Sequence, residues 1–492
     1  MKISELYIYP IKSLRPCAVQ RARLRVEGVE HDRRFMLLKV VAPKDAGADG
    51  ASEASKSSSS AAAAATTSYK PVQVVKMPEA ALFSQRLVVN GSDHHRPLDQ
   101  DEQQQQDPDA EPDTIEVTYN IPETPVAPSH PSQSQPLLVP LQPTADFLRG
   151  CAIVDVSLMG SRGAGYRMGD PYDAWFSACL GYEAHLVYVG DFQRKILAHL
   201  PGGGGSGDVN GGMGGGLLPS GLSSTMSSYF PAGLLQSVFG SSASASPSAR
   251  EPTLVYNESA PFLVTNRASL RDFSRRFEDE GSAGMDMTKF RPNIVVDEEH
   301  DDDRANDVKS PSAAGPEDGQ VRMDTVAKAD QLQPWEEDYW AELVISPAPT
   351  DAATSSSPPA KSTAITTSTA ARRPQCTLEL TANCGRCNSI NVDYATGRTA
   401  KGEQGTALKK LMRDRRVDVG EKYTPIFGRY GYLVGAAVAG QQGGGLGGAV
   451  EDNNRRTGAI ESEGVEVHVG DEVVVTRRNT EHGVWAWPKY KD

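Results

Sequence analysis

The sequence predicts a β-rich α+β protein that is barrel-like in its folded parts and carries long low-complexity insertions at loop tips. Three observations support this fold class. Segments with strand-like patterning occur from the first residues of the chain to about residue 475. Only two or three segments show the spacing of amphipathic helices. Between them lie tracts rich in Ala, Ser, Gly, Gln or acidic residues, which carry too little apolar surface to offset the entropy of ordering the chain.

Strand patterns are clearest near the two ends of the chain. The segment RARLRV at 21–26 alternates arginines with apolar residues, which is the period of a strand with one wet face. The segment VEVHVGDEVVV at 465–475 has two valine-rich runs separated by Gly470 and Asp471. We expect this second segment to form a hairpin around a tight turn.

Three helices are predicted between the strands. The first follows Asp170, a suitable N-cap residue, and has Pro171 at its first helical position. The second is SLRDFSRRFEDE at 269–280, where apolar residues recur at i, i+3 and i+7. The third is GTALKKLMRDRR at 405–416. We expect the apolar stripes of these helices to pack into the core rather than to carry chemistry.

Composition excludes several classes of protein. The 492 residues carry a net charge of −13, and the isoelectric point near 5.3 argues against a nucleic-acid binder, which needs a basic face. Six scattered cysteines do not suggest a disulfide framework and favour a reducing compartment. No window is long and apolar enough for a membrane span, and the N-terminal residues do not resemble a targeting segment. We therefore expect a cytoplasmic protein with no integral membrane segment.

Cys384 and Cys387 are the most closely spaced cysteines, and their chemistry is open on residues alone. A structural zinc site needs four ligands, but only Cys376 lies near and no histidine follows at ligand spacing. A redox dithiol would open a helix after a strand, whereas this pair lies between two strand-like segments. A single metal thiolate is the third reading, since thiolates suit soft, redox-active metals and Arg386 would favour the thiolate form. Two ordinary core cysteines would give the same pattern.

Cations recur in the most motif-like segments of this acidic chain. Lys12 lies in YPIKS, Arg33 and Arg34 lie in HDRRFML, Arg291 lies in FRPN, and Arg386 lies in CGRC. Three of these segments adjoin predicted strands, at turns where donors can converge. Arginine forks together with a lysine suit a ligand that bears a phosphate. Four unrelated surface charges are the alternative reading.

Seven motifs follow one another along the chain: LYIYPIKSLR, GVEHDRRFMLL, SAPFLVTNRASL, FRPNIVV, CGRCNSINVDYATG, PIFGRYGYL and VHVGDEVVV. In this order they resemble a MOSC-domain protein with its N-terminal β-barrel domain, and in particular the family of the mitochondrial amidoxime reducing component and its bacterial counterparts. The resemblance covers nearly all of the chain between the low-complexity tracts. It implies an N-terminal β-barrel domain over 1–200, with disordered insertions at about 42–70 and 99–113, and a MOSC domain over 253–478. The remaining segments are a Gly/Ser-rich insertion at 201–252, insertions in the MOSC domain at about 297–330, 346–374 and 438–457, and a C-terminal tail at 479–492.

The resemblance implies a molybdenum-containing oxidoreductase with the molybdenum cofactor, Mo-molybdopterin. In that family the metal is held by the two dithiolene sulfurs of the pterin and by the second cysteine of the C-x-R-C segment. That residue is Cys387 here, as metal ligand and catalytic residue, and Cys384 becomes a bystander. The cofactor-binding residues that the resemblance implies are Lys12, Ser13, Arg33, Ser259, Arg291, Asn293, Arg386 and Tyr430.

The implied reaction is the reduction of N-hydroxylated compounds, such as amidoximes and hydroxylamines, by oxygen-atom transfer to molybdenum. The alternative is a cofactor-binding or sulfur-carrier module, like the C-terminal domain of molybdenum cofactor sulfurase. The chain shows neither the hydrophobic anchor of mitochondrial members nor the four-cysteine iron–sulfur module of some bacterial members. The expected electron donor is therefore a haem protein of the cytochrome b type with its flavin reductase, and docking to mitochondria is left open. Two departures from the family pattern are Ser259-Ala260 in place of a Thr-Ser pair, and Gly385 at a position where a hydroxyl is lost.

Overall fold

The structure is a computed structural model, and part of the chain is described in it. The low-complexity tracts predicted from the sequence lie almost entirely outside the described residues. One boundary of that prediction is wrong, because Ser68–Pro71 form strand β6, which pairs with β5 (Phe35–Val41). The described residues are 1–41, 68–89, 112–202, 252–277, 284–298, 332–348, 373–437 and 464–489.

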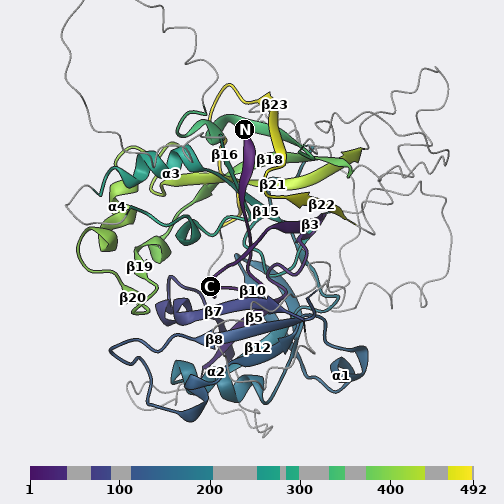
Figure 1. Cartoon of the computed structure of the whole chain (residues 1–492), viewed down its shortest axis with the longest axis vertical. Coiled ribbons are helices and arrows are strands. Elements are labelled where there is room, and N and C mark those ends of the chain that lie inside the picture. Colours follow the sequence, from purple (N-terminus) through teal and green to yellow (C-terminus); the bar gives the residue numbers. More distant parts are fainter. Residues whose placement is uncertain are drawn as a thin grey trace, which may run out of the picture.

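Seven strands close into a barrel, which confirms the β-rich, barrel-like prediction. Their order is β16–β15–β21–β18–β17–β23–β1, and β1 pairs back onto β16. Neighbours run antiparallel except β15 and β16, which are parallel. In Figure 1 the N-terminal strand, drawn purple, lies among the teal, green and yellow strands of the barrel. The strands are β1 (Lys2–Ile8), β15 (Phe262–Asn266), β16 (Ile294–Asp297), β17 (Trp340–Ser346), β18 (Gln375–Gly385), β21 (Ile426–Ala437) and β23 (Glu472–Arg478), with β2 (Cys17–Val19) added beyond β1.

Alternating burial along the strands fills the barrel interior. On β17, for example, Leu343 and Ile345 are buried, whereas Val344 between them is partly exposed. The same interior receives Ile3 and Leu6 from β1, so the barrel joins the first residues of the chain to strands that begin only at Phe262. The barrel thus takes one strand from the sequence range 1–200 and six from the range 253–478, and these domain ranges themselves stay a prediction.

A second group of sheets lies beside the barrel, in the lower half of Figure 1. A five-stranded antiparallel sheet has the order β10–β11–β12–β5–β6, and a three-stranded sheet has the order β7–β8–β9. Helix α2 (Tyr172–Leu180) packs on β12 and shares one core with both sheets. The strands are β7 (Phe83–Val88), β8 (Thr114–Tyr119), β9 (Leu137–Pro140), β10 (Ile153–Leu158), β11 (Ser161–Arg167) and β12 (Ala184–Tyr188), and a short helix α1 spans Ala145–Arg149.

The remaining elements are short. Strand pairs β13–β14 and β19–β20 are two-stranded sheets, and β22, β3 and β4 form a three-stranded sheet. Among the described residues, no helix has the length and the apolar character to cross a membrane. The elements are β3 (Arg21–Arg25), β4 (Gly28–Val29), β13 (Arg194–Lys195), β14 (Thr253–Leu254), α3 (Arg267–Ser274), β19 (Val392–Asp393), β20 (Arg398–Thr399), α4 (Ala407–Leu411) and β22 (Val465–His468), with 3-10 helices at Pro78–Leu82, Pro131–Ser134, Met287–Phe290, Glu336–Tyr339, Asn388–Asn391 and Gly402–Thr406.

All three predicted helices are present, although each is shorter than its pattern. The first begins one residue later than predicted, since Pro171 is its N-cap, while the Asp170 carboxylate still accepts a hydrogen bond from the Ala174 amide at 3.1 Å. The second predicted helix is α3, whose Leu270 and Phe273 are buried as the stripe predicts. The third is α4, preceded by a 3-10 turn.

The predicted hairpin at 465–475 is wrong, although its turn exists. Strand β22 pairs with β3, whereas β23 pairs with β17 and β1. The buried Asp471 carboxylate accepts hydrogen bonds from the Arg373 guanidinium at 2.8 Å and from the His468 amide at 2.8 Å. The turn is therefore held by contacts of Asp471, and each of its two arms pairs with a different strand.

Candidate functional site

The two cysteines of the CGRC segment face different environments. Strand β18 ends at Gly385, and Cys387 is the N-cap of the 3-10 turn Asn388–Asn391. Cys384 is only 2% exposed, whereas Cys387 is exposed, with its sulfur 3.2 Å from the Ser389 hydroxyl. The loop between them is held by the Arg386 amide, which donates to the Pro425 carbonyl at 2.8 Å. The fold therefore presents one thiol to solvent or a ligand and buries the other.

Arg386 connects the cysteine loop to the FRPN segment. Its Nη1 donates to the Cys384 sulfur at 2.8 Å, and its Nη2 donates to the Phe290 carbonyl at 2.7 Å. Burial alone would lower the pKa of Arg386, but the neighbouring Cys384 and Tyr430 outweigh it and raise that pKa. The Tyr430 hydroxyl also bonds to Cys384, and burial first, then this contact, raises the pKa of Tyr430 well above its ordinary value. Cys384, expected as a bystander, thus orients two of the predicted site residues.

The arginines of the DRR and FRPN motifs meet over one aromatic ring. The guanidinium carbons of Arg33 and Arg291 lie 4.5 and 4.4 Å from the centroid of the Tyr9 ring, a cation–π distance. The Arg33 Nη2 donates to the Arg291 carbonyl at 3.2 Å, and its Nη1 lies 3.3 Å from the Asn293 Oδ1. Asp32 forms an ion pair with Arg33. The side chains predicted at 33, 291 and 293 are therefore brought together, and Tyr9 is a partner that the charge pattern did not reveal.

Left-handed backbone is unusually frequent at these positions. Ser13, Arg33 and Arg291 have φ of 75°, 50° and 57°, although none of them is glycine. Such conformations cost roughly 1–3 kcal/mol each and cluster at ligand sites, where surrounding structure holds them. Asn293 contributes to that support, because its side chain bonds both the Leu263 amide at 3.2 Å and the Tyr7 carbonyl at 3.2 Å.

Lys12 is buried and paired with Glu258. Burial lowers the pKa of Lys12, while Glu258 opposes that shift. Burial alone would raise the pKa of Glu258, but Lys12, Arg194 and Arg33 outweigh it and hold that pKa below its ordinary value. The hydroxyl of Ser13, the neighbour of Lys12, donates to the Val72 carbonyl at 2.8 Å. Its predicted contact with a ligand remains a prediction.

Arg194 positions the segment that bears Glu258. It is almost fully buried, and it donates to the Val255 carbonyl at 2.8 Å, to the Leu158 carbonyl at 3.0 Å and to the Asn257 carbonyl. Burial lowers the pKa of Arg194 to about 10. Nothing in the local sequence of Arg194 signals this role, because its partners are main-chain carbonyls distant in the chain.

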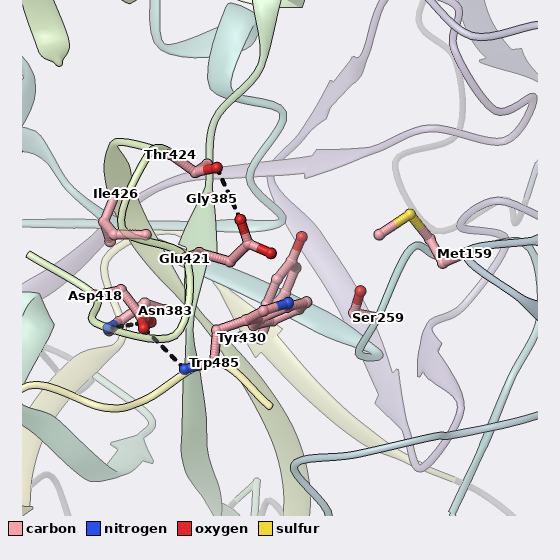
Figure 2. A pocket seen from close by; sticks show the side chains of 10 residues that line it. All are labelled: Met159, Ser259, Asn383, Gly385, Asp418, Glu421, Thr424, Ile426, Tyr430 and Trp485. Carbon is pink, nitrogen blue, oxygen red and sulfur yellow. Dashed lines mark hydrogen bonds between the residues drawn. The ribbon is translucent and has the colours of Figure 1, made fainter. Parts of the chain in front are cut away.

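A cavity of about 200 Å³ adjoins the cysteine loop. Its wall includes Gly385 from the loop, Tyr430 from β21 and Ser259 from the segment before β15. Figure 2 shows the Tyr430 ring against Trp485, with Ser259 and Met159 on the other side of the opening. Two of the predicted site residues, Tyr430 and Ser259, therefore share one cavity.

Two family models match the chain. The model of the MOSC N-terminal beta barrel domain matches residues 1–43, and that of the MOSC domain matches residues 325–474. The chain is a MOSC-domain protein. Domains of this kind are associated with molybdenum cofactor-binding proteins. A search among curated proteins gives no match.

The candidate site residues of this MOSC-domain protein are distributed over the two matched ranges and the segment between them. Residues 1–43 hold Lys12 and Arg33, and residues 325–474 hold the cysteine loop and Tyr430. Ser259, Arg291 and Asn293 lie between the matched ranges. The site is therefore assembled from both matched domains and from the segment that joins them.

The residues present fit a phosphate-bearing cofactor. Three buried polar atoms near the cations, the Tyr9 hydroxyl, the Ser259 hydroxyl and the Arg386 Nε, have no hydrogen-bond partner in the described part of the chain. Buried polar groups are seldom left unpaired, so each of these three atoms can take a hydrogen-bond partner from a bound ligand. The exposed Cys387 thiol beside these donors adds one soft ligand suited to a redox metal.

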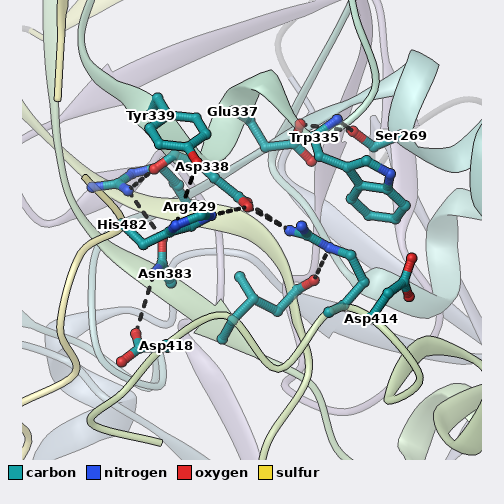
Figure 3. A network of polar contacts seen from close by, with 12 residues as sticks. Ser269, Trp335, Glu337, Asp338, Tyr339, Asn383, Asp414, Asp418, Arg429 and His482 are labelled. Carbon is teal, nitrogen blue, oxygen red and sulfur yellow. Dashed lines mark hydrogen bonds and ion pairs between the residues drawn. The ribbon is translucent and has the colours of Figure 1, made fainter. Parts of the chain in front are cut away.

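A buried polar network supports the cavity from behind (Figure 3). Asp338 accepts two hydrogen bonds from Arg415, at 2.8 and 2.6 Å. Arg429 donates to the Asp338 carbonyl and, at 3.0 Å, to Asn383, whose amide donates in turn to Asp418 at 3.1 Å. Asn383 and Asp418 line the cavity, so this MOSC-domain protein ties the cavity wall to an ion pair in its core.

Proposed function

We propose that this protein is a molybdenum cofactor-dependent oxidoreductase that reduces N-hydroxylated compounds such as amidoximes and hydroxylamines. The observation that carries the proposal is the exposed Cys387 thiol, which lies in a MOSC domain next to buried cations and unpaired donors. When bound, the cofactor would supply the two electrons and accept the oxygen of the N–O bond.

Each residue group has a separate task in this proposal. Cys387 would ligate the metal, and the Ser389 hydroxyl 3.2 Å from its sulfur can donate a hydrogen bond to the thiolate. Lys12, Arg33 and Arg291 would hold the phosphate, because fork-shaped and point-charge donors both suit it. Ser259, Asn293 and Arg386 would flank the pterin, together with Tyr430.

Tyr430 stays protonated at neutral pH in this site, since burial and its contact with Cys384 raise its pKa. Reduction of an amidoxime to an amidine and water takes up two electrons and two protons. In this proposal the neutral phenol at the cavity wall would be one source of these protons.

The proposal extends to partners. The electron donor would be a haem protein of the cytochrome b type with its flavin reductase, acting in the cytoplasm. The competing function is a cofactor-binding or sulfur-carrier module, which the exposure of Cys387 also suits, because a carrier must offer its thiol to a partner.

The test is metal analysis of the purified protein beside Cys387→Ala, with Cys151→Ala as a control outside the site. Benzamidoxime and a hydroxylamine would be assayed with a chemical electron donor, which makes the protein partners unnecessary. Molybdenum bound by the wild type and by Cys151→Ala, and both metal and activity lost in Cys387→Ala, are the expected results. Molybdenum without reduction of either substrate would favour the carrier function. Zinc in place of molybdenum would refute both.

A further inference from the structure

The cavity beside the cysteine loop has an acidic and aromatic wall. Two carboxylates, Asp418 and Glu421, line it, and none of the described residues that line it is Lys, Arg or His. The rings of Tyr430 and Trp485 form another part of the wall, with centroids 6.1 Å apart. Such a wall disfavours anions and attracts a cation, by charge and by the electron-rich faces of the rings.

The two carboxylates have different roles. Asp418 is almost fully buried, and its oxygens accept from the Gly420 amide at 2.9 Å, from the Trp485 amide at 2.9 Å and from the Asn383 amide group at 3.1 Å. Asp418 therefore stabilises its own loop and the C-terminal segment through these three hydrogen bonds. Glu421 is exposed, and one of its oxygens accepts from the Thr424 hydroxyl at 3.1 Å. Its other oxygen has no partner in the described part of the chain, so Glu421 can take up a ligand.

The wall is held in place before any ligand binds. Trp485 stacks on His199, with centroids 5.0 Å apart, and on Trp487, with centroids 6.0 Å apart. Burial lowers the pKa of His199, so that ring is uncharged at neutral pH and does not compete as a cation. Figure 2 shows the Glu421 carboxylate on the same side of the cavity as the Tyr430 and Trp485 rings. A cation beside Glu421 would therefore lie near both rings.

Gly385 brings this acidic wall close to the cysteine loop. A Cβ at Gly385 would lie 2.8 Å from the Thr424 side chain, so a larger residue would push the 421–424 turn away. Gly385, where the resembled family has a residue with a hydroxyl, is thus the position at which the cysteine loop contacts the 421–424 turn. The Ser259 hydroxyl, buried and without a partner in the described chain, faces the same cavity from the opposite wall.

We propose that this cavity selects substrates whose non-reacting end carries a positive charge, such as an arylmethylammonium group, and that Glu421 is the residue that recognises the charge. The selection of substrates rests on the proposed function, whereas binding of a cation to the cavity is independent of that function. A cavity of this volume suits one small ring with a short substituent. Met159 supplies an adaptable apolar contact for that ring.

The binding test uses benzylamine and its neutral analogue benzyl alcohol in ligand-observed NMR titrations of the full-length protein. The variant is Glu421→Gln, and the matched control is Glu123→Gln, an exposed glutamate that does not line the cavity. Benzylamine should bind the wild type and the control equally well and Glu421→Gln roughly tenfold more weakly, since a charge-assisted hydrogen bond is lost. Benzyl alcohol should bind all three alike. Equal affinity of the two probes for the wild type, or equal weakening of both by Glu421→Gln, would overturn the proposal.

The turnover test separates this inference from the proposed function. It compares kcat/KM for 4-(aminomethyl)benzamidoxime and 4-(hydroxymethyl)benzamidoxime in the same three proteins. A preference for the charged substrate that disappears in Glu421→Gln supports both proposals. Benzylamine binding that depends on Glu421 without turnover of either substrate would refute the proposed function and leave the cation site standing. Turnover with no charge preference in any protein would refute selection of charged substrates by this cavity and leave the proposed function standing.

Discussion

The Arg386 guanidinium donates a 2.8 Å hydrogen bond to the buried sulfur of Cys384, two residues before it in the chain. This bond turns Arg386 back toward the end of β18, while its second terminal nitrogen reaches the Phe290 carbonyl beside Arg291. Through Arg386, the buried sulfur of Cys384 is therefore linked to the segment that bears Arg291. The exposed cysteine is left free for ligation.

Replacement of Cys384 should loosen the bound metal without removing its ligand. In Cys384→Ala, Arg386 and Tyr430 lose a shared partner, and we expect metal retention to fall about tenfold, as for other residues that orient a ligand. The measurement is molybdenum per chain during dialysis against a chelator. Cys376→Ala is the matched control, because Cys376 is equally buried but lies in the barrel core. If the two variants lose metal at the same rate, Cys384 has only a packing role.

In the metal-free protein, Tyr9 should stabilise the fold through its ring and not through its hydroxyl. Tyr9→Phe keeps the surface on which Arg33 and Arg291 lie and removes a buried hydroxyl without a described partner, so stability should rise by about 1 kcal/mol. Tyr9→Leu removes both cation–π contacts and should lower the free energy of unfolding by roughly 2–4 kcal/mol. Urea unfolding of the metal-free protein measures both. A loss of stability in Tyr9→Phe would show that the hydroxyl has a partner after all.

Lys12 should be needed for the cofactor more than for the fold. The double variant Lys12→Met/Glu258→Gln removes the ion pair between a buried lysine and a partly exposed glutamate as a unit. Neither charge is left without its partner, so we expect stability within about 1 kcal/mol of wild type. Pterin content after purification should nevertheless fall strongly, because the phosphate loses its lysine. Fluorescence of the released, oxidised pterin measures the content, and thermal unfolding measures stability. Normal pterin content in the double variant would exclude Lys12 from the phosphate site.

More of the fold than of the candidate site could be predicted from the sequence. Strand alternation predicted the β-rich, barrel-like fold, and helical spacing predicted the packing stripes, because the residues on one buried face repeat every second residue in a strand and every third or fourth in a helix. The partners of β22 and β23 could not be predicted, since β3, β17 and β1 lie far from them in the sequence. Within the site, the cations were visible as charges in an acidic chain. Tyr9 and Glu258 were not, because their roles come only from contacts made across the fold.

Glu337 should make stability fall as the pH rises. Burial, and then the adjacent Asp338, raises the pKa of Glu337 to about 7 from its ordinary 4.5. The folded state therefore holds a proton that the unfolded state releases between about pH 4.5 and 7, and this contribution to stability is lost across that window, up to about 3 kcal/mol. Glu337→Gln keeps an acceptor for the Ser269 hydroxyl and should remove that slope and be more stable than wild type at pH 8.

Urea unfolding at several pH values provides this measurement. Glu336→Gln, the partly exposed neighbour, is the control and should retain the wild-type slope. An unchanged slope in Glu337→Gln would mean that another group takes up the proton.

The closure of the barrel sets the order of events during synthesis. Strand β1 leaves the ribosome before the other strands of the barrel and can pair early with β2. Its neighbours in the barrel are β16 and β23, and Lys2 pairs with Glu472. At 5–20 residues per second, translation takes roughly half a minute to a minute and a half to supply that last neighbour. Until then Ile3 and Leu6 have no barrel interior in which to be buried. The strand is therefore prone to pair with other chains during synthesis. Efficient production in cells should therefore depend on chaperones that bind the segment with β1 while the later barrel strands are still being made.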